Sequence, residues 1–209
     1  MRFLVATLMR VRVEGLSNVP EGAALLAANH LGHADPAVTG ALLREPPEVI
    51  ALSELREAPV APLMWLYAPI TVRRDEIDRD VLRATLAALR RGEKVFLCPE
   101  AHISRTGALE QAREGIGYLA LHAGVPVVPV AITGTERLAA EWKRLRRPPV
   151  TVTFAPPIVS QHDPGLPRRA QRHALTQQVM CAIAAHLPPP YRGVYASALD
   201  SKGLPPKGS

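Results

Sequence analysis

Apolar residues recur along this chain with two kinds of spacing, one typical of strands and the other of helices. Short runs that are apolar throughout, or that alternate apolar and polar residues, predict strands. The run 23–28 is the clearest case: all six of its residues are alanine or leucine, so we expect a strand buried on both faces. Strands are predicted at 9–14, 23–28, 48–53, 70–72, 94–98, 126–132 and 150–154.

Longer stretches with apolar residues three and four positions apart predict helices. The stretch 78–91 begins with an acidic residue, ends in two arginines and is followed by Gly92. This order of an acidic start, a basic end and a terminal glycine is typical of a helix. Helices are predicted at 35–43, 62–67, 78–91, 108–123, 135–146 and 167–186.

Strands and helices alternate along most of the chain, which predicts an α/β fold with a central, mostly parallel or mixed sheet flanked by helices. The chain has 209 residues, enough for one domain, which we expect to span 1–187. Residues 188–209 begin with three prolines and continue rich in Gly, Pro and Ser, so we expect a loosely held tail there. The prolines in the run 125–130 predict an edge strand or a bend.

The loop after the strand 23–28 holds the strongest candidate chemistry. Residues 29–36 read Asn-His-Leu-Gly-His-Ala-Asp-Pro, and strand-to-helix loops of this kind carry the sites of open α/β sheets. On a helix, His30 and Asp35 would point about 140° apart, so they meet only in a turn, which Gly32 permits. We expect Asp35 at the N-cap of the next helix, with Pro36 at its first position. His30 would then be a base oriented by a carboxylate, with a substrate hydroxyl as the nucleophile.

Other interpretations of these residues remain open. An Asp-Pro pair is a common way to begin a helix, and a loop histidine is often only a surface residue. His30, His33 and Asp35 are also a possible metal site, although they lack an evident fourth ligand. Cys98 ends the strand 94–98 and is either a nucleophile or, as we favour, a thiol of the core.

Charge and cysteine content restrict the partners. The net charge is +6, which suits phospholipid headgroups, the phosphates of coenzyme A, an acidic carrier protein or nucleic acid. Aromatic residues make up only 4%, which weighs against base stacking. The chain has two cysteines and no signal-peptide pattern, as expected in a reducing compartment. No apolar run reaches the ~18–20 residues that span a bilayer. The longest uncharged run, 58–72, predicts a buried segment or a patch on a membrane surface.

Four short blocks occur in a fixed order: Asn29-His30 with Asp35, then Arg74, then Pro99-Glu100, then the run 125–130. They resemble the four motif blocks of the glycerolipid acyltransferases, the family of bacterial 1-acylglycerol-3-phosphate acyltransferases. The first block is the His-X4-Asp motif of that family. The resemblance covers roughly residues 11–195.

The resemblance implies an enzyme of phospholipid biosynthesis. It would move a fatty acyl group from acyl-CoA or acyl carrier protein to the free hydroxyl of 1-acylglycerol-3-phosphate. His30 would be the general base and Asp35 would orient it, with no cofactor besides the acyl donor. We expect the protein in the cytoplasm, peripheral at the inner face of the cell membrane, with no nucleic acid as partner.

The resemblance also implies the acceptor-binding residues. Arg74 would bind phosphate and Glu100 would shape the acceptor site, with Arg105 and His102 as further substrate-binding residues. The chain departs from the family where Ala68 and Ala101 replace glycines and where no arginine stands at 102 or 103. These departures keep two alternatives open: the same chemistry on another lyso-lipid, or a non-catalytic basic domain that binds membranes or nucleic acid.

Overall fold

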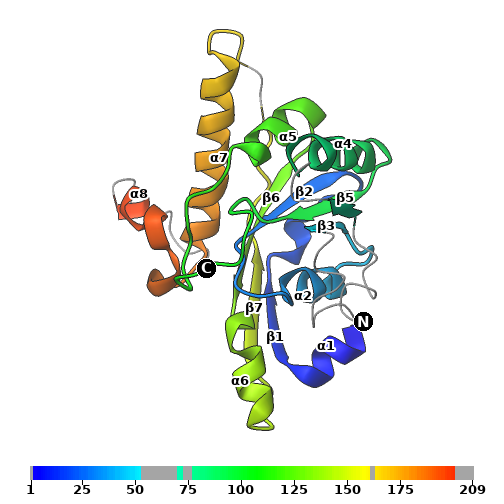
Figure 1. Cartoon of the computed structure of the whole chain (residues 1–209), viewed down its shortest axis with the longest axis vertical. Helices are drawn as coiled ribbons and strands as arrows, with labels where there is room; N and C mark the ends of the chain where they lie inside the picture. Colours follow the sequence, from blue (N-terminus) through cyan, green and yellow to red (C-terminus); the bar gives the residue numbers. More distant parts are fainter. Residues whose placement is uncertain (1, 53–69, 73–76, 161–162, 201–209) are drawn as a thin grey trace.

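In the computed structural model the chain forms a three-layer α/β fold around one twisted sheet (Figure 1). The structure describes residues 2–52, 70–72, 77–160 and 163–200. Seven described strands lie in the order β1-β7-β6-β2-β5-β3-β4. Their bounds are β1 Arg10–Glu14, β2 Ala24–Ala28, β3 Glu48–Leu52, β4 Ile70–Val72, β5 Lys94–Leu97, β6 Val127–Thr133 and β7 Pro149–Phe154. Among these strands every pairing is parallel except that of β6 with β7, so the predicted fold class is confirmed.

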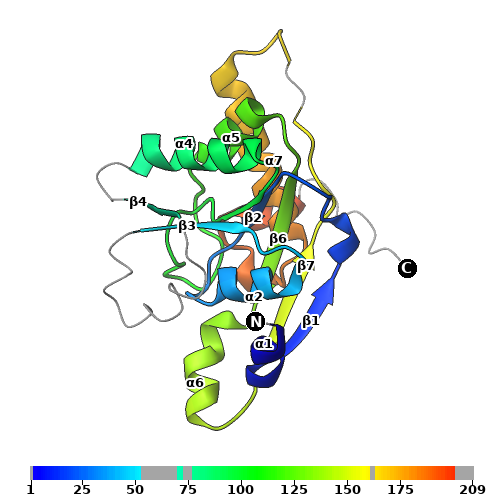
Figure 2. The same cartoon turned by 90° about the vertical axis from the view of Figure 1, so that its right-hand side faces the viewer.

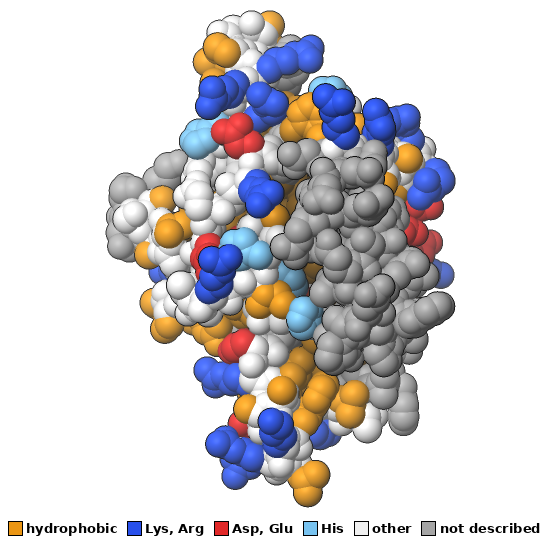
Figure 3. Space-filling model, viewed as in Figure 1, with side chains coloured by type: hydrophobic (Ala, Val, Ile, Leu, Met, Phe, Trp, Pro, Cys, Tyr) orange, Lys and Arg blue, Asp and Glu red, His pale blue; other side chains and the backbone are white. Residues whose placement is uncertain are grey.

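The helices cover both faces of the sheet, as the two views together show (Figures 1 and 2). One face packs against α4, α5, α7 and α8, and the other against α1, α2 and the start of α6. The helices are α1 Arg2–Leu8, α2 Asp35–Leu42, α4 Ile77–Arg90, α5 Gly115–Ala123, α6 Leu138–Lys143, α7 Arg168–Ala185 and α8 Ala196–Asp200. Lys and Arg side chains lie at both the upper and the lower end of the face in Figure 3.

Strand β2 is apolar throughout because it lies in the middle of the sheet. Leu25 and Ala27 point into the cluster under α5 and α7, whereas Leu26 and Ala28 point into the cluster under α2. All five residues of the strand are buried. A fully buried leucine contributes roughly 1.5–3 kcal/mol to folding, so this strand anchors whatever follows it.

The topology fixes the edge at which chemistry can occur. Strands β2, β5 and β6 are parallel, so their carboxyl ends meet at one edge of the sheet. The loop after β2, the loop after β5 and the 3-10 turn η4 (Thr135–Arg137) after β6 therefore lie together. Gly32 in the loop after β2 lies close to η4, because a Cβ added at Gly32 would be 3.4 Å from the Thr135 carbonyl oxygen.

The predicted helix 108–123 is wrong in its first part, since α5 begins only at Gly115. The segment before it is irregular, and its backbone groups bind other parts of the chain instead of a helix. The Leu109 N–H donates to the Tyr191 carbonyl oxygen at 2.9 Å, and the Arg113 N–H donates to the Pro99 carbonyl oxygen at 2.9 Å. Apolar spacing alone did not reveal these long-range partners.

The expectation of a loosely held tail is also wrong for residues 188–200. They form the 3-10 turns η5 (Pro189–Tyr191) and η6 (Gly193–Tyr195) and helix α8. Tyr195 and Leu199 are buried in the main apolar cluster, and this burial offsets the conformational freedom that the prolines and glycines suggest. The domain boundary at 187 stays a prediction.

Two further predictions need correction, and others fall on residues outside the described ranges. Strand β6 is central, so its prolines do not mark an edge. The predicted helix 135–146 divides into η4 and the short α6. Several predictions fall outside the described residues. They are the helix at 62–67, the uncharged run 58–72 except for residues 70–72, Arg74, and the part of the tail at 201–209.

Candidate active site

His30 and Asp35 lie together in the turn that joins β2 to α2. The Asp35 Oδ2 atom is 2.9 Å from His30 Nδ1 and also accepts hydrogen bonds from the Leu31 N–H at 2.8 Å and the Gly32 N–H at 2.9 Å. Asp35 is the first residue of α2 rather than its N-cap, which is Ala34. Its carboxylate therefore turns back toward the loop and fixes the histidine there.

This contact determines which ring nitrogen of His30 is available for chemistry. Because Asp35 Oδ2 already accepts two backbone N–H groups, it acts toward His30 as an acceptor, and Nδ1 carries the proton. The lone pair of the neutral ring is then on Nε2. The His30 side chain is 19% exposed, whereas that of Asp35 is fully buried, so only the histidine of this pair can meet a substrate.

The Asp35 carboxylate stabilises the imidazolium that His30 becomes when it accepts a proton. Burial lowers the pKa of His30, whereas the Cys98 sulfur and the Asp35 carboxylate raise it, and the net effect is a raised pKa. Burial raises the pKa of the Cys98 thiol, so that thiol is uncharged at neutral pH. The Asp35 carboxylate is then the charge that holds the pKa of His30 above 6.5.

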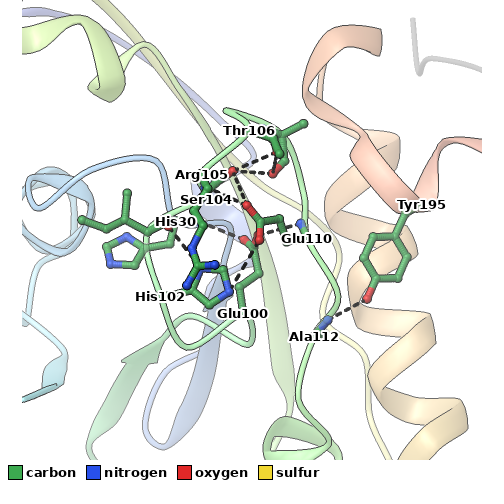
Figure 4. Close-up of polar contacts among 11 residues, drawn as sticks. His30, Glu100, His102, Ser104, Arg105, Thr106, Glu110, Ala112 and Tyr195 are labelled. Atoms are coloured by element: carbon green, nitrogen blue, oxygen red, sulfur yellow. Dashed lines mark hydrogen bonds and ion pairs between the residues drawn. The ribbon is translucent and has the colours of Figure 1, made fainter.

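Glu100 joins the histidine loop to the loop after β5 (Figure 4). Its Oε1 atom accepts from the His30 N–H at 3.2 Å, and its Oε2 atom accepts from the Glu110 N–H at 2.7 Å. The Ser104 N–H in turn donates to the His30 carbonyl oxygen at 2.8 Å. Glu100 is 1% exposed, and burial raises the pKa of its carboxyl group. The residue predicted to shape the acceptor site thus fixes the backbone around His30.

Asn29 precedes His30 in the motif, and its side chain binds the backbone of strand β6. Its Nδ2 donates to the Ile132 carbonyl oxygen at 2.9 Å and its Oδ1 accepts from the Ile132 N–H at 2.7 Å. This side chain extends the pairing of β2 with β6 by one step beyond the strand. The backbone directly before His30 is therefore held to the sheet. The only sign of this role in the sequence is that Asn29 directly follows the buried strand 23–28.

The loop 101–110 carries the remaining predicted site residues. Its backbone turns sharply at Ala101, whose φ of 61° is a left-handed conformation that favours glycine. The His102 ring and the Arg105 backbone both face the Glu110 carboxylate: His102 Nε2 is 3.6 Å from Oε2, and the Arg105 N–H donates to Oε1 at 2.7 Å. The Arg105 side chain is exposed. Sequence reasoning missed Glu110, which has no motif of its own.

The alternatives for this site can be compared with the geometry. Cys98 packs beside the apolar cluster under α2, and its raised pKa disfavours the thiolate that a nucleophile needs. His33 is exposed, and burial together with the charge of His30 lowers its pKa. Among the described residues, no three metal-ligating side chains gather in a metal-binding arrangement, so His30, His33 and Asp35 do not form the alternative metal site.

Comparisons with known proteins give one consistent result. A family model described as acyltransferase matches residues 10–133. The 1-acyl-sn-glycerol-3-phosphate acyltransferase of Salmonella typhimurium is 30% identical over 172 residues, covering 78% of this chain and 69% of the relative. The enzyme of the same name from Escherichia coli is 27% identical over 159 residues, covering 73% and 64%.

A solved structure has the same fold. The crystal structure of the 1-acyl-sn-glycerophosphate (LPA) acyltransferase PlsC from Thermotoga maritima superposes with a TM-score of 0.61 at 22% identity. The match covers 85% of this chain and 74% of that one. Within the part of this chain that the structure describes, helices are too short or too polar to cross a membrane.

Proposed function

Because the chain belongs to the acyltransferase family, we propose that it moves a fatty acyl group from acyl-CoA or acyl carrier protein to the free hydroxyl of 1-acylglycerol-3-phosphate. The product would be phosphatidate. The observation that carries this proposal is the 2.9 Å contact between His30 Nδ1 and Asp35 Oδ2, which leaves Nε2 as the ring nitrogen that Asp35 does not bind. The names of the relatives support the choice of acceptor.

In the proposed mechanism, His30 acts as the general base. Its Nε2 takes the proton from the acceptor hydroxyl as the oxygen attacks the carbonyl carbon of the thioester. The carbon–oxygen bond forms, and the tetrahedral intermediate collapses with cleavage of the carbon–sulfur bond. The departing sulfur takes the proton back from His30, so free thiol and acylated lipid leave and no acyl-enzyme forms. Asp35 stabilises the imidazolium that exists between these steps.

The remaining predicted roles belong to the same proposal. Arg105 and His102 would contact the acceptor headgroup from the loop 101–110, and Arg74 would bind its phosphate. We place Glu100 behind them, where it holds the loop against His30. The lipid acceptor requires peripheral contact with a membrane, and the net charge of +6 supports an anionic surface such as the inner face of the cell membrane.

One observation supports a second acceptor within the same reaction class. The loop 101–110 has two groups that could bind a phosphate, the Arg105 N–H and the His102 ring. Both already face the Glu110 carboxylate. Hydrogen bonding to the Arg105 N–H lowers the pKa of Glu110, so it is negatively charged at neutral pH. A carboxylate at this position favours a lyso-lipid whose headgroup includes a cation, such as an ethanolamine.

A transfer assay tests the function and the acceptor together. Purified protein is mixed with an acyl donor, either acyl-CoA or acylated acyl carrier protein. The acceptor is either 1-acylglycerol-3-phosphate or lysophosphatidylethanolamine, and the products are identified by mass. Phosphatidate supports the first proposal, and Glu110→Gln should then lower the KM for the phosphate acceptor. Diacyl product only from the ethanolamine lipid supports the second. No product from any lyso-lipid with either donor would contradict both and favour a binding domain without catalysis.

A further inference from the structure

The end of helix α6 carries an unusual combination of exposed side chains. Residues 142–147, which we call the basic tip, read Trp-Lys-Arg-Leu-Arg-Arg. Leu145 is 97% exposed, the highest value among the large apolar side chains that the structure describes as exposed, and Trp142 is 40% exposed. The four residues that flank Leu145, two on each side, are all basic. Hydrophobic and basic side chains lie together at the α6 end of Figure 3.

The backbone at Leu145 makes this exposure more informative. The Arg146 N–H donates to the Glu141 carbonyl oxygen, and the Leu145 N–H donates to that of Trp142, both at 2.9 Å. This is the Schellman arrangement that ends many helices, and Leu145 occupies the left-handed position where glycine is usual, with φ of 56°. A large apolar side chain thus stands where glycine would be easier, without burial to offset the strain.

The basic tip is also held firmly on the body of the protein. The Trp142 Nε1–H donates to the Leu8 carbonyl oxygen at 2.9 Å, and Arg147 Nη2 donates to the Met9 carbonyl oxygen at 3.1 Å. Arg147 therefore has a structural task. Lys143, Arg144 and Arg146 remain exposed at the surface, with Arg144 3.5 Å from Glu141. The tip presents its charges and Leu145 without first having to fold.

The position of the tip relates it to His30. Helix α6 follows η4 at the carboxyl end of β6, and β2, which leads to His30, runs parallel to β6. The basic tip therefore projects from the sheet edge that holds the candidate active site (Figure 1). The opposite edge carries Val159, next to the bridge between Ile158 and the start of β6, and beyond it lies the start of α7.

We propose that the basic tip docks the protein on an anionic phospholipid surface. Leu145 and Trp142 would enter the headgroup region, while Lys143, Arg144 and Arg146 contact lipid phosphates. A lipid surface fits better than nucleic acid because it accepts both the apolar and the basic side chains, whereas a phosphate backbone accepts only the latter. Docking rests on the proposed function for its purpose, delivery of a lipid acceptor to His30, but binding requires no turnover.

The experiment measures binding of the full chain to vesicles without an acyl donor. Vesicles of phosphatidylcholine with phosphatidylglycerol are compared with pure phosphatidylcholine by sedimentation. Lys143→Glu/Arg146→Glu should weaken binding to the anionic vesicles by at least about 25-fold, because each basic residue near such a surface is worth about fivefold. Leu145→Asn should weaken binding several-fold while leaving the fold intact, since asparagine tolerates a left-handed backbone.

Matched controls come from the opposite edge of the sheet. Arg168→Glu/Arg169→Glu reverses two exposed charges there, and Val159→Asn replaces a side chain that is 66% exposed. Both should bind vesicles like the wild type. The chain has two tryptophans, so in a Trp65→Phe background Trp142 alone reports. Its fluorescence should shift to the blue on anionic vesicles and be quenched by brominated lipid.

Several outcomes would overturn the proposal. The first is that the tip variants bind vesicles as tightly as the wild type, and the second is that the control variants lose as much vesicle binding as the tip variants. The third is tight binding to duplex DNA that displaces vesicles. The fourth is a dimer in sedimentation equilibrium that Leu145→Asn dissociates without affecting vesicle binding. A separate assay with a dispersed short-chain acceptor tests turnover. Tip-dependent binding without turnover would contradict the proposed function only, and turnover with tip-independent binding would contradict the docking proposal only.

Discussion

Glu100→Gln is the substitution that tests the geometry of the site most sharply. The Glu100 carboxylate accepts one backbone N–H at each oxygen, from His30 and from Glu110, in a position that is 1% exposed. Glutamine has only one oxygen, so its NH2 group must face one of these two N–H donors. The Glu110 contact is shorter, 2.7 Å against 3.2 Å, so we expect the oxygen to keep Glu110 and the NH2 group to face His30.

The magnitude follows from this count of donors. A buried donor left without its acceptor costs about 1–3 kcal/mol. For a chain of this size each kcal/mol lowers Tm by roughly 2–4 °C, so Glu100→Gln should lower Tm by about 2–12 °C. The His30 backbone should move away from the new donor, and a displacement on the order of 1 Å can reduce kcat/KM by about 100-fold.

The assay combines thermal unfolding by circular dichroism with acyl-transfer rates. Glu21→Gln is the matched control. It makes the same chemical change at an exposed position, so we expect it to leave Tm and kcat/KM unchanged. Glu100→Ala should be less stable still, since it leaves both N–H groups without an acceptor and opens a cavity. If Glu100→Gln matches the wild type in Tm and kcat/KM, the bridge between the loops does not position His30 and this reasoning is refuted.

Three further predictions concern the same loops. Ala101→Gly should raise the free energy of unfolding by about 1 kcal/mol, measured by urea denaturation, because Ala101 has φ of 61°; no gain would mean that the turn is unstrained. Asn29→Ala should lower Tm and kcat/KM together, because it leaves both backbone groups of Ile132 without partners; a variant with full activity would deny it a positioning role. The raised pKa of His30 means that its contact with Asp35 stabilises the fold fully below pH 6.5 and that this contribution is lost as pH rises from there through the raised pKa. In Asp35→Asn we therefore expect the pH–rate profile of kcat/KM to shift to lower pH, and an unshifted profile would show that Asp35 does not set the pKa of His30.

The parts of the fold that follow from local pattern could be predicted from the sequence. The run 23–28 is apolar throughout because β2 is buried on both faces, and Asp35 and Pro36 begin the helix after the turn, as their sequence indicates. The approach of His30 to Asp35 follows from that turn. The mostly parallel sheet follows from the alternation of strands and helices along the chain.

The parts that depend on distant partners could not be predicted. Residues 108–114 have helical spacing, but their N–H groups bind Pro99, Glu100 and the segment 191–195. The prolines after 187 suggested a tail, yet Tyr195 is buried in the main apolar cluster, where its hydroxyl oxygen accepts a hydrogen bond from the Ala112 N–H at 3.1 Å. Glu100 was expected to shape the acceptor site, and nothing in the sequence indicated that its carboxylate accepts the backbone N–H groups of His30 and Glu110.

The central claim is that His30 acts as the general base of an acyl transfer. The most direct measurement is a single-turnover reaction of wild type and His30→Ala with acyl donor and the best lyso-lipid acceptor, following acylated lipid by mass. Because general-base catalysis contributes roughly 10²–10⁴-fold, His30→Ala should slow the chemical step by that factor while the protein still binds vesicles. Equal rates for the two proteins, with the variant folded, would contradict the account.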